Sequence, residues 1–172
     1  MTDDRRPTNG TADVIFLRVD AGSPEAHWAL KQYFDELDRR FDGGFKTDAA
    51  LDEAAPSFTP PSGLFVLAML GDDIVGCGGV QWIDESTAEI RRMWVDPARR
   101  GIGLGKRLLE HFESEVQGSG RARVLLDTNA RLAEAVSMYR ALGYHDIERY
   151  NDNPYAQHWF EKALGRSDPD GS

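Results

Sequence analysis

A basic, glycine-rich segment carries the clearest chemical signal in this sequence. Residues 99–106 read Arg-Arg-Gly-Ile-Gly-Leu-Gly-Lys. An apolar run that ends at Asp96-Pro97 precedes the segment and an amphipathic pattern follows it, so the segment joins a strand to the start of a helix. Glycines leave backbone N–H groups accessible, and a helix N-terminus adds unpaired N–H groups and a positive dipole end. With the cations of Arg100 and Lys106 beside it, the segment is predicted to bind phosphate.

The order Arg-x-x-Gly-x-Gly at residues 100–105, after a strand that carries Glu89, resembles the coenzyme-A-binding motif of the GNAT superfamily of N-acetyltransferases. Two other phosphate-binding motifs do not fit these residues. A dinucleotide-binding loop needs Gly-x-Gly-x-x-Gly, whereas Lys106 takes the last of those positions here. A P-loop needs Gly-Lys-Ser/Thr, whereas Arg107 follows Lys106. The resemblance implies acetyl-CoA as co-substrate.

The resemblance also implies which residues bind acetyl-CoA. The loop would bind the pyrophosphate, and the main chain of Met93–Val95 would bind the pantetheine arm as an added strand and polarise the thioester carbonyl. Asn129 resembles the family asparagine that hydrogen-bonds the cofactor, and by position it is also an N-cap. The predicted binding residues are Met93, Trp94, Val95, Arg100, Gly101, Ile102, Gly103, Leu104, Gly105, Lys106 and Asn129.

Glu89 is the candidate general base. A lysine-like ammonium is only about 0.04% neutral at pH 7, so acetylation needs a group that accepts its proton. In the GNAT motif a glutamate at this strand position commonly does so, directly or through water. An ordinary carboxylate is a weak base, so the role requires burial or a water relay. The alternative is a strand-surface carboxylate paired with Arg91, which lies on the same face.

Tyr139 is the candidate general acid, because it resembles the helix tyrosine that in many GNAT enzymes protonates the coenzyme A thiolate. The ordinary pKa values of tyrosine and a thiol are about 10 and 8.5, so this transfer is not far uphill. The alternative is that Tyr139 only continues the apolar face of its helix. With Glu89 it implies direct transfer in a ternary complex, without a covalent enzyme intermediate.

The acceptor is expected to be a primary amine of a small molecule or peptide. Phe45 and Asn151 are the candidates for contacting it, whereas Tyr33 and Phe41 have helical spacing and are predicted to be core residues. The acidic composition mildly favours a cationic acceptor. An alternative function is a non-catalytic coenzyme A or acyl-CoA sensor on the same fold, which would need neither Glu89 nor Tyr139.

Composition argues against several other functions. The net charge of −9 opposes a nucleic-acid-binding face, and the loop accounts for most of the local arginine cluster, within which Arg92 and Arg107 are predicted to be solvated surface charges. The histidines lack metal-ligand spacing and Cys77 is predicted to be a small buried side chain, so no metal is expected. The sequence has no membrane-spanning run or signal peptide, which predicts a cytoplasmic protein without membrane contact, and a homodimer is compatible with it.

Hydrophobic periodicity predicts the elements that position these residues. We expect one domain over residues 1–172 with a core at 14–164 and disordered tails at 1–12 and 166–172. The order of elements matches the GNAT fold, which implies an α/β (α+β) protein with a mixed, mostly antiparallel sheet of about seven strands and about four helices. The expected strands are 14–19, 64–70, 74–83, 87–95, 124–128, 144–150 and 156–164, and the expected helices are 24–41, 47–55, 104–118 and 130–142.

Overall fold

The computed structural model describes residues 13–40, 55–128, 133–154 and 156–165. Its centre is one seven-stranded sheet in the order β1-β2-β3-β4-β5-β7-β6. Neighbouring strands are antiparallel except for the parallel pair β4–β5, which confirms the predicted fold class. The strands are β1 (Val14–Val19), β2 (Gly63–Leu70), β3 (Asp73–Trp82), β4 (Thr87–Val95), β5 (Arg123–Thr128), β6 (His145–Asp146) and β7 (His158–Ala163).

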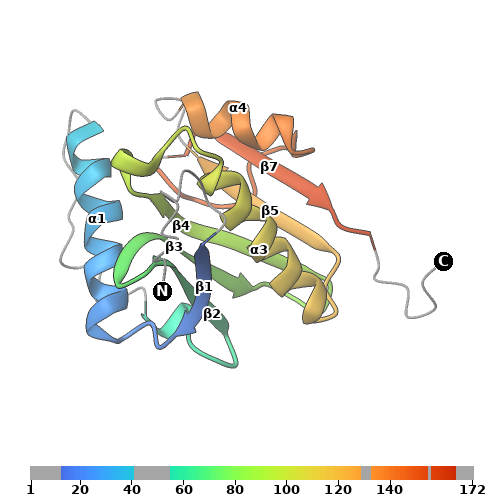
Figure 1. Ribbon diagram of the computed structural model, residues 1–172. Coiled ribbons are helices and arrows are strands. Elements are labelled where there is room, and N and C mark those ends of the chain that lie inside the picture. Colours follow the sequence, from blue (N-terminus) through green and yellow to red (C-terminus); the bar gives the residue numbers. More distant parts are fainter. Residues whose placement is uncertain (1–12, 41–54, 129–132, 155, 166–172) are drawn as a thin grey trace.

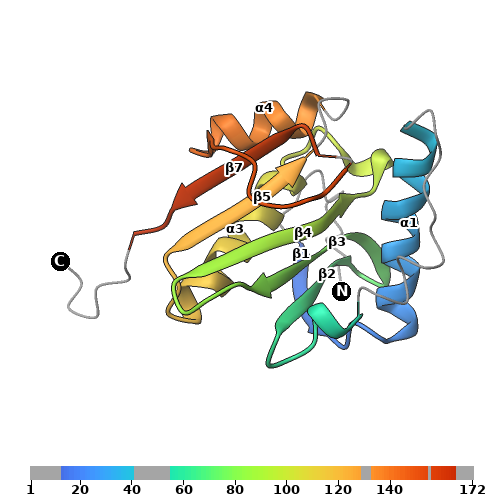
Figure 2. The ribbon, with the colours of Figure 1, turned by 180° about the vertical axis from the view of Figure 1, so that it is seen from behind.

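Helices cover both faces of the sheet. Helix α3 (Leu104–Gly118) lies in front of the strands in Figure 1 and behind them in Figure 2. Helix α4 (Ala133–Ala141) belongs to the same hydrophobic cluster as α3, whereas α1 (Pro24–Arg40) packs in a separate cluster. Successive strand residues point to opposite faces, so Val66 of β2 packs with α3 and Phe65 packs with α1. The short 3₁₀ helix η1 (Pro97–Arg99) leads into the glycine loop.

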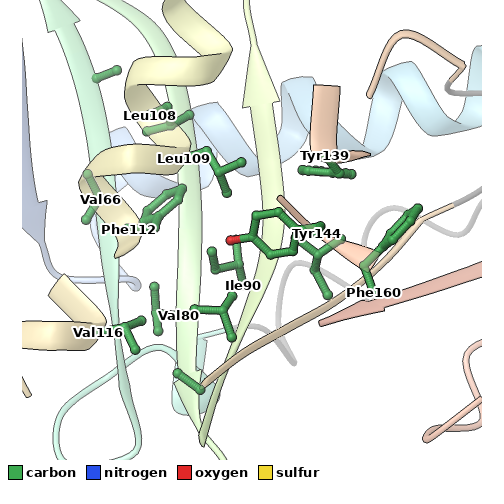
Figure 3. Close-up of a cluster of buried hydrophobic side chains, with 14 of the residues drawn as sticks. Val66, Val80, Ile90, Leu108, Leu109, Phe112, Val116, Tyr139, Tyr144 and Phe160 are labelled. Carbon is green, nitrogen blue, oxygen red and sulfur yellow. The ribbon is translucent and has the colours of Figure 1, made fainter. Parts of the chain in front are cut away.

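The larger cluster joins the helices to the middle of the sheet. In Figure 3, Phe112 and its neighbours on α3 point toward Val80 and Ile90, and Tyr139, Tyr144 and Phe160 lie together beside them. The Tyr139 ring centroid is 5.8 Å from that of Tyr144 and 5.9 Å from that of Phe160. This packing fixes α4 against β7, and with it the position of Tyr139.

Most predicted elements are confirmed within a few residues, but the last hairpin differs. The strand expected at 144–150 is reduced to His145–Asp146. After Ile147, whose N–H donates to Trp159 O, the chain leaves the ladder and its polar side chains bond elsewhere. The next strand begins at His158, not at 156, because the Ala156 N–H donates to Asn153 O in a turn. Both tails and most of the second helix expected at 47–55 lie outside the described residues, although residues 55–57 are helical.

The pairing of β4 with β5 is short. Thr87–Glu89 pair with Arg123–Leu125, and beyond them the two strands form no ladder, although both lie entirely within the described residues. Strand β5 stays paired with β7 along its whole length, so β4 is the strand that diverges. Its edge from Ile90 onward therefore faces a gap in the sheet.

A β-bulge bends β4 at this point. The register with β3 runs from Gly79 opposite Arg91 to Cys77 opposite Trp94, so Arg92 and Met93 together oppose Gly78. Arg92 has a φ of 60°. A bulge of this kind bends its strand and re-aims a side chain. Among the described helices, none is both long enough and apolar enough to span a membrane.

Replacing Gly78 by alanine should destabilise the protein, because the new Cβ would lie 2.4 Å from Cζ of the buried Phe112 ring. Overpacking of this kind costs about 1–3 kcal/mol, so the free energy of unfolding in urea should fall by that amount. Gly118→Ala is the matched control, because a Cβ there meets no atom of the described residues within 4 Å. It should unfold at the same or a slightly higher urea concentration than the wild type. Wild-type stability of Gly78→Ala would contradict the close approach of β3 to Phe112.

Candidate active site

A pocket with a volume of about 350 Å³ opens where β4 leaves β5. Its walls are the end of β4, the glycine loop, the first turn of α3 and the inner face of α4. Nine predicted binding residues line it: Met93, Trp94, Val95, Arg100, Gly101, Gly103, Leu104, Gly105 and Lys106. Ile102 is exposed and is not among the lining residues, and Asn129 lies outside the described residues.

The loop has the conformation that an anion-binding backbone requires. Gly101 and Gly103 have φ values of 87° and 84°, which side chains other than glycine rarely adopt. No atom of the described residues lies within 4 Å of a Cβ built at either position, so glycine is needed there for the backbone conformation. Gly103 is the N-cap of α3 and offers no side-chain bond, so the first N–H groups of the helix stay available at the pocket.

The arginine of the motif is more constrained than the sequence suggests. The Arg100 Nε donates to Val95 O at 3.1 Å, and its guanidinium forms an ion pair with Glu36 of α1. Glu36 and Glu134, neither of which was predicted, also line the pocket. Arg100 therefore joins the loop to both β4 and α1. Lys106 is 60% exposed, and its Nζ lies 3.9 Å from Glu110 Oε1 one turn along α3.

Glu89 is buried, with 5% of its surface exposed. The Tyr150 hydroxyl donates to its Oε2 at 2.7 Å, and the Arg91 Nε lies 3.6 Å from its Oε1. Burial raises the pKa of Glu89 above its ordinary value, although the Tyr150 hydrogen bond and the charge of Arg91 lower it. Glu89 is thus buried, as a general base would need to be, and it is also paired with Arg91, as the alternative interpretation expects.

Asn151 connects Glu89 to a second carboxylate. Its amide nitrogen lies 2.5 Å from Oδ2 of Asp127 and 3.5 Å from Oε2 of Glu89. The Asn153 amide donates to the other Asp127 oxygen at 3.0 Å, and the Trp159 indole donates to Asn151 Oδ1 at 2.9 Å. Asn151 therefore lies beside the candidate base but is not among the residues that line the larger cavity, and its role toward a substrate stays a prediction. Phe45 lies outside the described residues.

A second, smaller cavity of about 80 Å³ adjoins the first. The two share Met93, Ala135 and Tyr139. Its other walls include Tyr33, Arg91, Arg92, Asp127 and Asn153. Sequence reasoning did not single out Asp127, because in the sequence it is one polar residue at the end of an apolar strand.

The prediction that Arg92 and Arg107 are solvated surface charges is wrong. The Arg92 guanidinium is 5.0 Å from the ring centroid of Phe34, and the Arg107 guanidinium is 5.4 Å from that of Phe16. Arg92 Nε and Arg107 Nη1 are buried without a hydrogen-bond partner in the described part of the chain. Strand alternation alone assigns Arg92 to the face opposite Arg91, and only the bulge brings both to one cavity.

Tyr139 is both a core residue and a lining residue of both cavities. It is 7% exposed, and burial raises the pKa of its hydroxyl. Proton transfer from Tyr139 to a thiolate is therefore further uphill than ordinary pKa values indicate. Burial likewise raises the pKa of the free thiol Cys77, which is a packing residue as predicted. The described residues contain no group of three or more His, Cys, Asp or Glu placed to hold a metal ion.

The hydrogen bond from Tyr150 should hold down the pKa of Glu89. Tyr150→Phe removes a donor to the charged carboxylate, so the pKa of Glu89 should rise, as measured by NMR titration of ¹³C-labelled glutamate carboxyl groups. Tyr144→Phe is the matched control, because the Tyr144 hydroxyl bonds Glu113 instead. An unchanged Glu89 titration in Tyr150→Phe, or an equal shift in Tyr144→Phe, would contradict this geometry.

Comparisons with known proteins agree with the fold and the loop. The family model described as "Acetyltransferase (GNAT) family" matches residues 28–144. Among curated proteins, the chain is 31% identical over 119 residues to an IAA acetyltransferase from Azospirillum brasilense, with 69% of this chain and 78% of the relative covered.

Two solved structures show the same fold at low identity. A GNAT family acetyltransferase from Elizabethkingia anophelis with acetyl-CoA bound is 15% identical, with TM-score 0.65 and coverage of 89% of this chain and 98% of the other. An aminoglycoside 6'-N-acetyltransferase complexed with coenzyme A is 20% identical, with TM-score 0.68 and coverage of 90% and 99%. Together with the family match over most of the sheet and the glycine loop, these findings establish that the chain belongs to the GNAT acetyltransferase family.

Proposed function

We propose that this protein is an N-acetyltransferase that transfers the acetyl group of acetyl-CoA to a primary amine by direct attack in a ternary complex. The observation that carries the proposal is the pair of adjoining cavities. The larger one lies at the glycine loop, the smaller one lies at Asp127, and they meet at Met93, Ala135 and Tyr139. A co-substrate and an acceptor can therefore be held at the same time with a shared boundary between them.

The larger cavity fits acetyl-CoA through the main chain of its loop and the exposed edge of β4. The left-handed glycines and the N-terminus of α3 would hold the pyrophosphate, with Lys106 adding an exposed cation. The unpaired edge of β4 at Met93–Val95 would bind the amide groups of the pantetheine arm. Acetyl-CoA supplies an activated thioester, and two proteins of the same fold are described as binding coenzyme A or acetyl-CoA.

Glu89 would accept the amine proton through water. Glu89 lines neither cavity, whereas its neighbours Ile90 and Arg91 line the smaller one. A water molecule would therefore carry the proton from the amine to the Glu89 carboxylate. The neutral amine nitrogen then bonds to the carbonyl carbon, the C–S bond breaks and the electron pair leaves with sulfur. The nitrogen loses its second proton as the amide forms, and this balances the proton that the thiolate takes up. The raised pKa of Glu89 makes it a stronger base than an ordinary carboxylate.

Tyr139 would donate to the departing thiolate. Its position on the boundary of both cavities is the place where the sulfur must leave. Because burial raises its pKa, the hydroxyl stays protonated and first stabilises the thiolate as a hydrogen-bond donor. A coenzyme A sensor would need no such group, so the presence of both Glu89 and Tyr139 favours an enzyme.

Loss of Glu89 should remove one limb of the pH profile. Because only its charged form accepts a proton, kcat/KM should fall as pH falls through a pKa that lies above the ordinary glutamate value. Glu89→Gln should lower kcat by about 100- to 10,000-fold and abolish this limb. Glu113→Gln is the control, since Glu113 bonds Tyr144 and Lys162 away from the cavities, and it should keep the limb. Wild-type rates in Glu89→Gln would exclude the base role.

The function itself is tested by release of free thiol from acetyl-CoA with pooled small amines and lysine peptides. We expect amine-dependent release by the wild type and a strong decrease of kcat in Tyr139→Phe, which keeps the ring packing but removes the hydroxyl. Equal rates would retain the enzyme and exclude Tyr139 as acid. Coenzyme A binding without release by any pool would favour the sensor.

A further inference from the structure

The smaller cavity has walls of opposite charge. Arg91 and Arg92 of β4 lie on one wall, and Asp127 of β5 lies on another. The strands diverge here, so the charges stand across a gap and Arg92 forms no ion pair with any described carboxylate. A cavity of this kind is suited to a ligand that carries both a positive and a negative group.

The bulge in β4 is what brings the second guanidinium to the cavity. In a regular strand Arg91 and Arg92 would point to opposite faces, but the left-handed φ of Arg92 lets both line the same space. A left-handed backbone conformation is strained for arginine, and such strain is commonly found at functional sites, where the surrounding structure maintains it. The two bulged residues lie opposite Gly78 of β3, where a side chain would clash with Phe112.

One hydrogen-bond donor of Arg92 has no partner within the described residues. Its guanidinium is held between the aromatic rings of Tyr33 and Phe34, at 6.0 and 5.0 Å from their centroids. These rings and the Tyr33 hydroxyl orient the group, but its Nε has no hydrogen-bond partner within the described residues. Arg91, by contrast, already contacts Glu89 and Gln81. Arg92 lines the cavity and has no carboxylate partner among the described residues, so its charge calls for a carboxylate or similar anion there.

The opposite wall is built to receive an ammonium group. The amides of Asn151 and Asn153 each donate to one oxygen of Asp127, which fixes the carboxylate without neutralising it. Asn151 also bonds Glu89, so the two carboxylates and the amides form one network. An ammonium held at Asp127 would lie beside the proposed base and next to the boundary with the larger cavity.

We propose that the acceptor is an α-amino acid, whose ammonium binds at Asp127 and whose carboxylate binds Arg92. The inference rests on the proposed acetyl transfer and names its substrate class. A polyamine would bring positive charge against the two guanidinium groups and leave Arg92 unpaired. Because Arg91 and Arg92 line the cavity, they disfavour the purely cationic acceptor that the net charge mildly favours.

The test compares free L-amino acids with their carboxamides in the thiol-release assay. Amidation removes the carboxylate and lowers the pKa of the neighbouring amine, so the amide reacts faster unless the protein binds the carboxylate. We expect kcat/KM to be about 10- to 100-fold higher for the acids, with most of the difference in KM. If thiol release is as fast or faster with the carboxamides than with the free amino acids, the inference is overturned and the proposed function stays intact. No release with either series would overturn both.

Substitution of Arg92 tests which residue reads the carboxylate. Arg92→Met keeps the packing against Phe34 and should remove the preference for the acids, so that the ratio of kcat/KM between acids and amides falls to about one. Arg121→Met is the matched control, because Arg121 lies 4.3 Å from the Trp82 ring centroid outside both cavities, and it should keep the acid preference. Retained preference in a folded Arg92→Met, with wild-type thermal denaturation, would overturn the assignment. If this variant fails to fold, the wild-type comparison of acids with amides decides the inference alone.

Discussion

The site depends on one break in the sheet: β4 and β5 pair only over their first residues. Strand β5 cannot leave β7, to which it is bonded throughout, so β4 bends away at the bulge opposite Gly78. The bend exposes a main-chain edge at Met93–Val95 in the middle of an otherwise paired sheet. Unpaired backbone groups in such a place need a partner, and a ligand arm that runs along the strand can supply one.

The packing around the break holds its two sides apart. On one face α3 and α4 pack on the sheet through a continuous core that includes Tyr139 (Figure 3). On the other face α1 packs on β4, holds Arg92 against its aromatic rings and pairs Glu36 with Arg100. Both cavities are thus bounded by rigid elements. The arrangement places cations at the loop and the bulge within a chain whose net charge is −9.

Local patterns in the sequence were enough to predict the strands, the long helices and the glycine loop, because each depends on residues adjacent in the chain. The apolar run of β4 that ends at Asp96-Pro97 and the apolar stripe of α3 are of this kind. The orientation of Arg92 was not predictable, because it depends on a glycine in the neighbouring strand. The same holds for the Arg100–Glu36 pair and for the short β6, whose following residues bond Glu89 and Asp127 across the fold. Glu89 and Tyr139 were placed in the expected region by resemblance, and their roles remain predictions.

A crystal structure of the protein with coenzyme A would test this account most directly. We predict that the pyrophosphate contacts the backbone N–H groups of the loop at Gly101–Lys106 and the start of α3. The pantetheine arm should hydrogen-bond the edge of β4 at Met93–Val95, with the sulfur near Tyr139 and the smaller cavity. A pantetheine arm outside the β4–β5 gap, or a sulfur far from Tyr139, would contradict the claim that this break in the sheet is the active site.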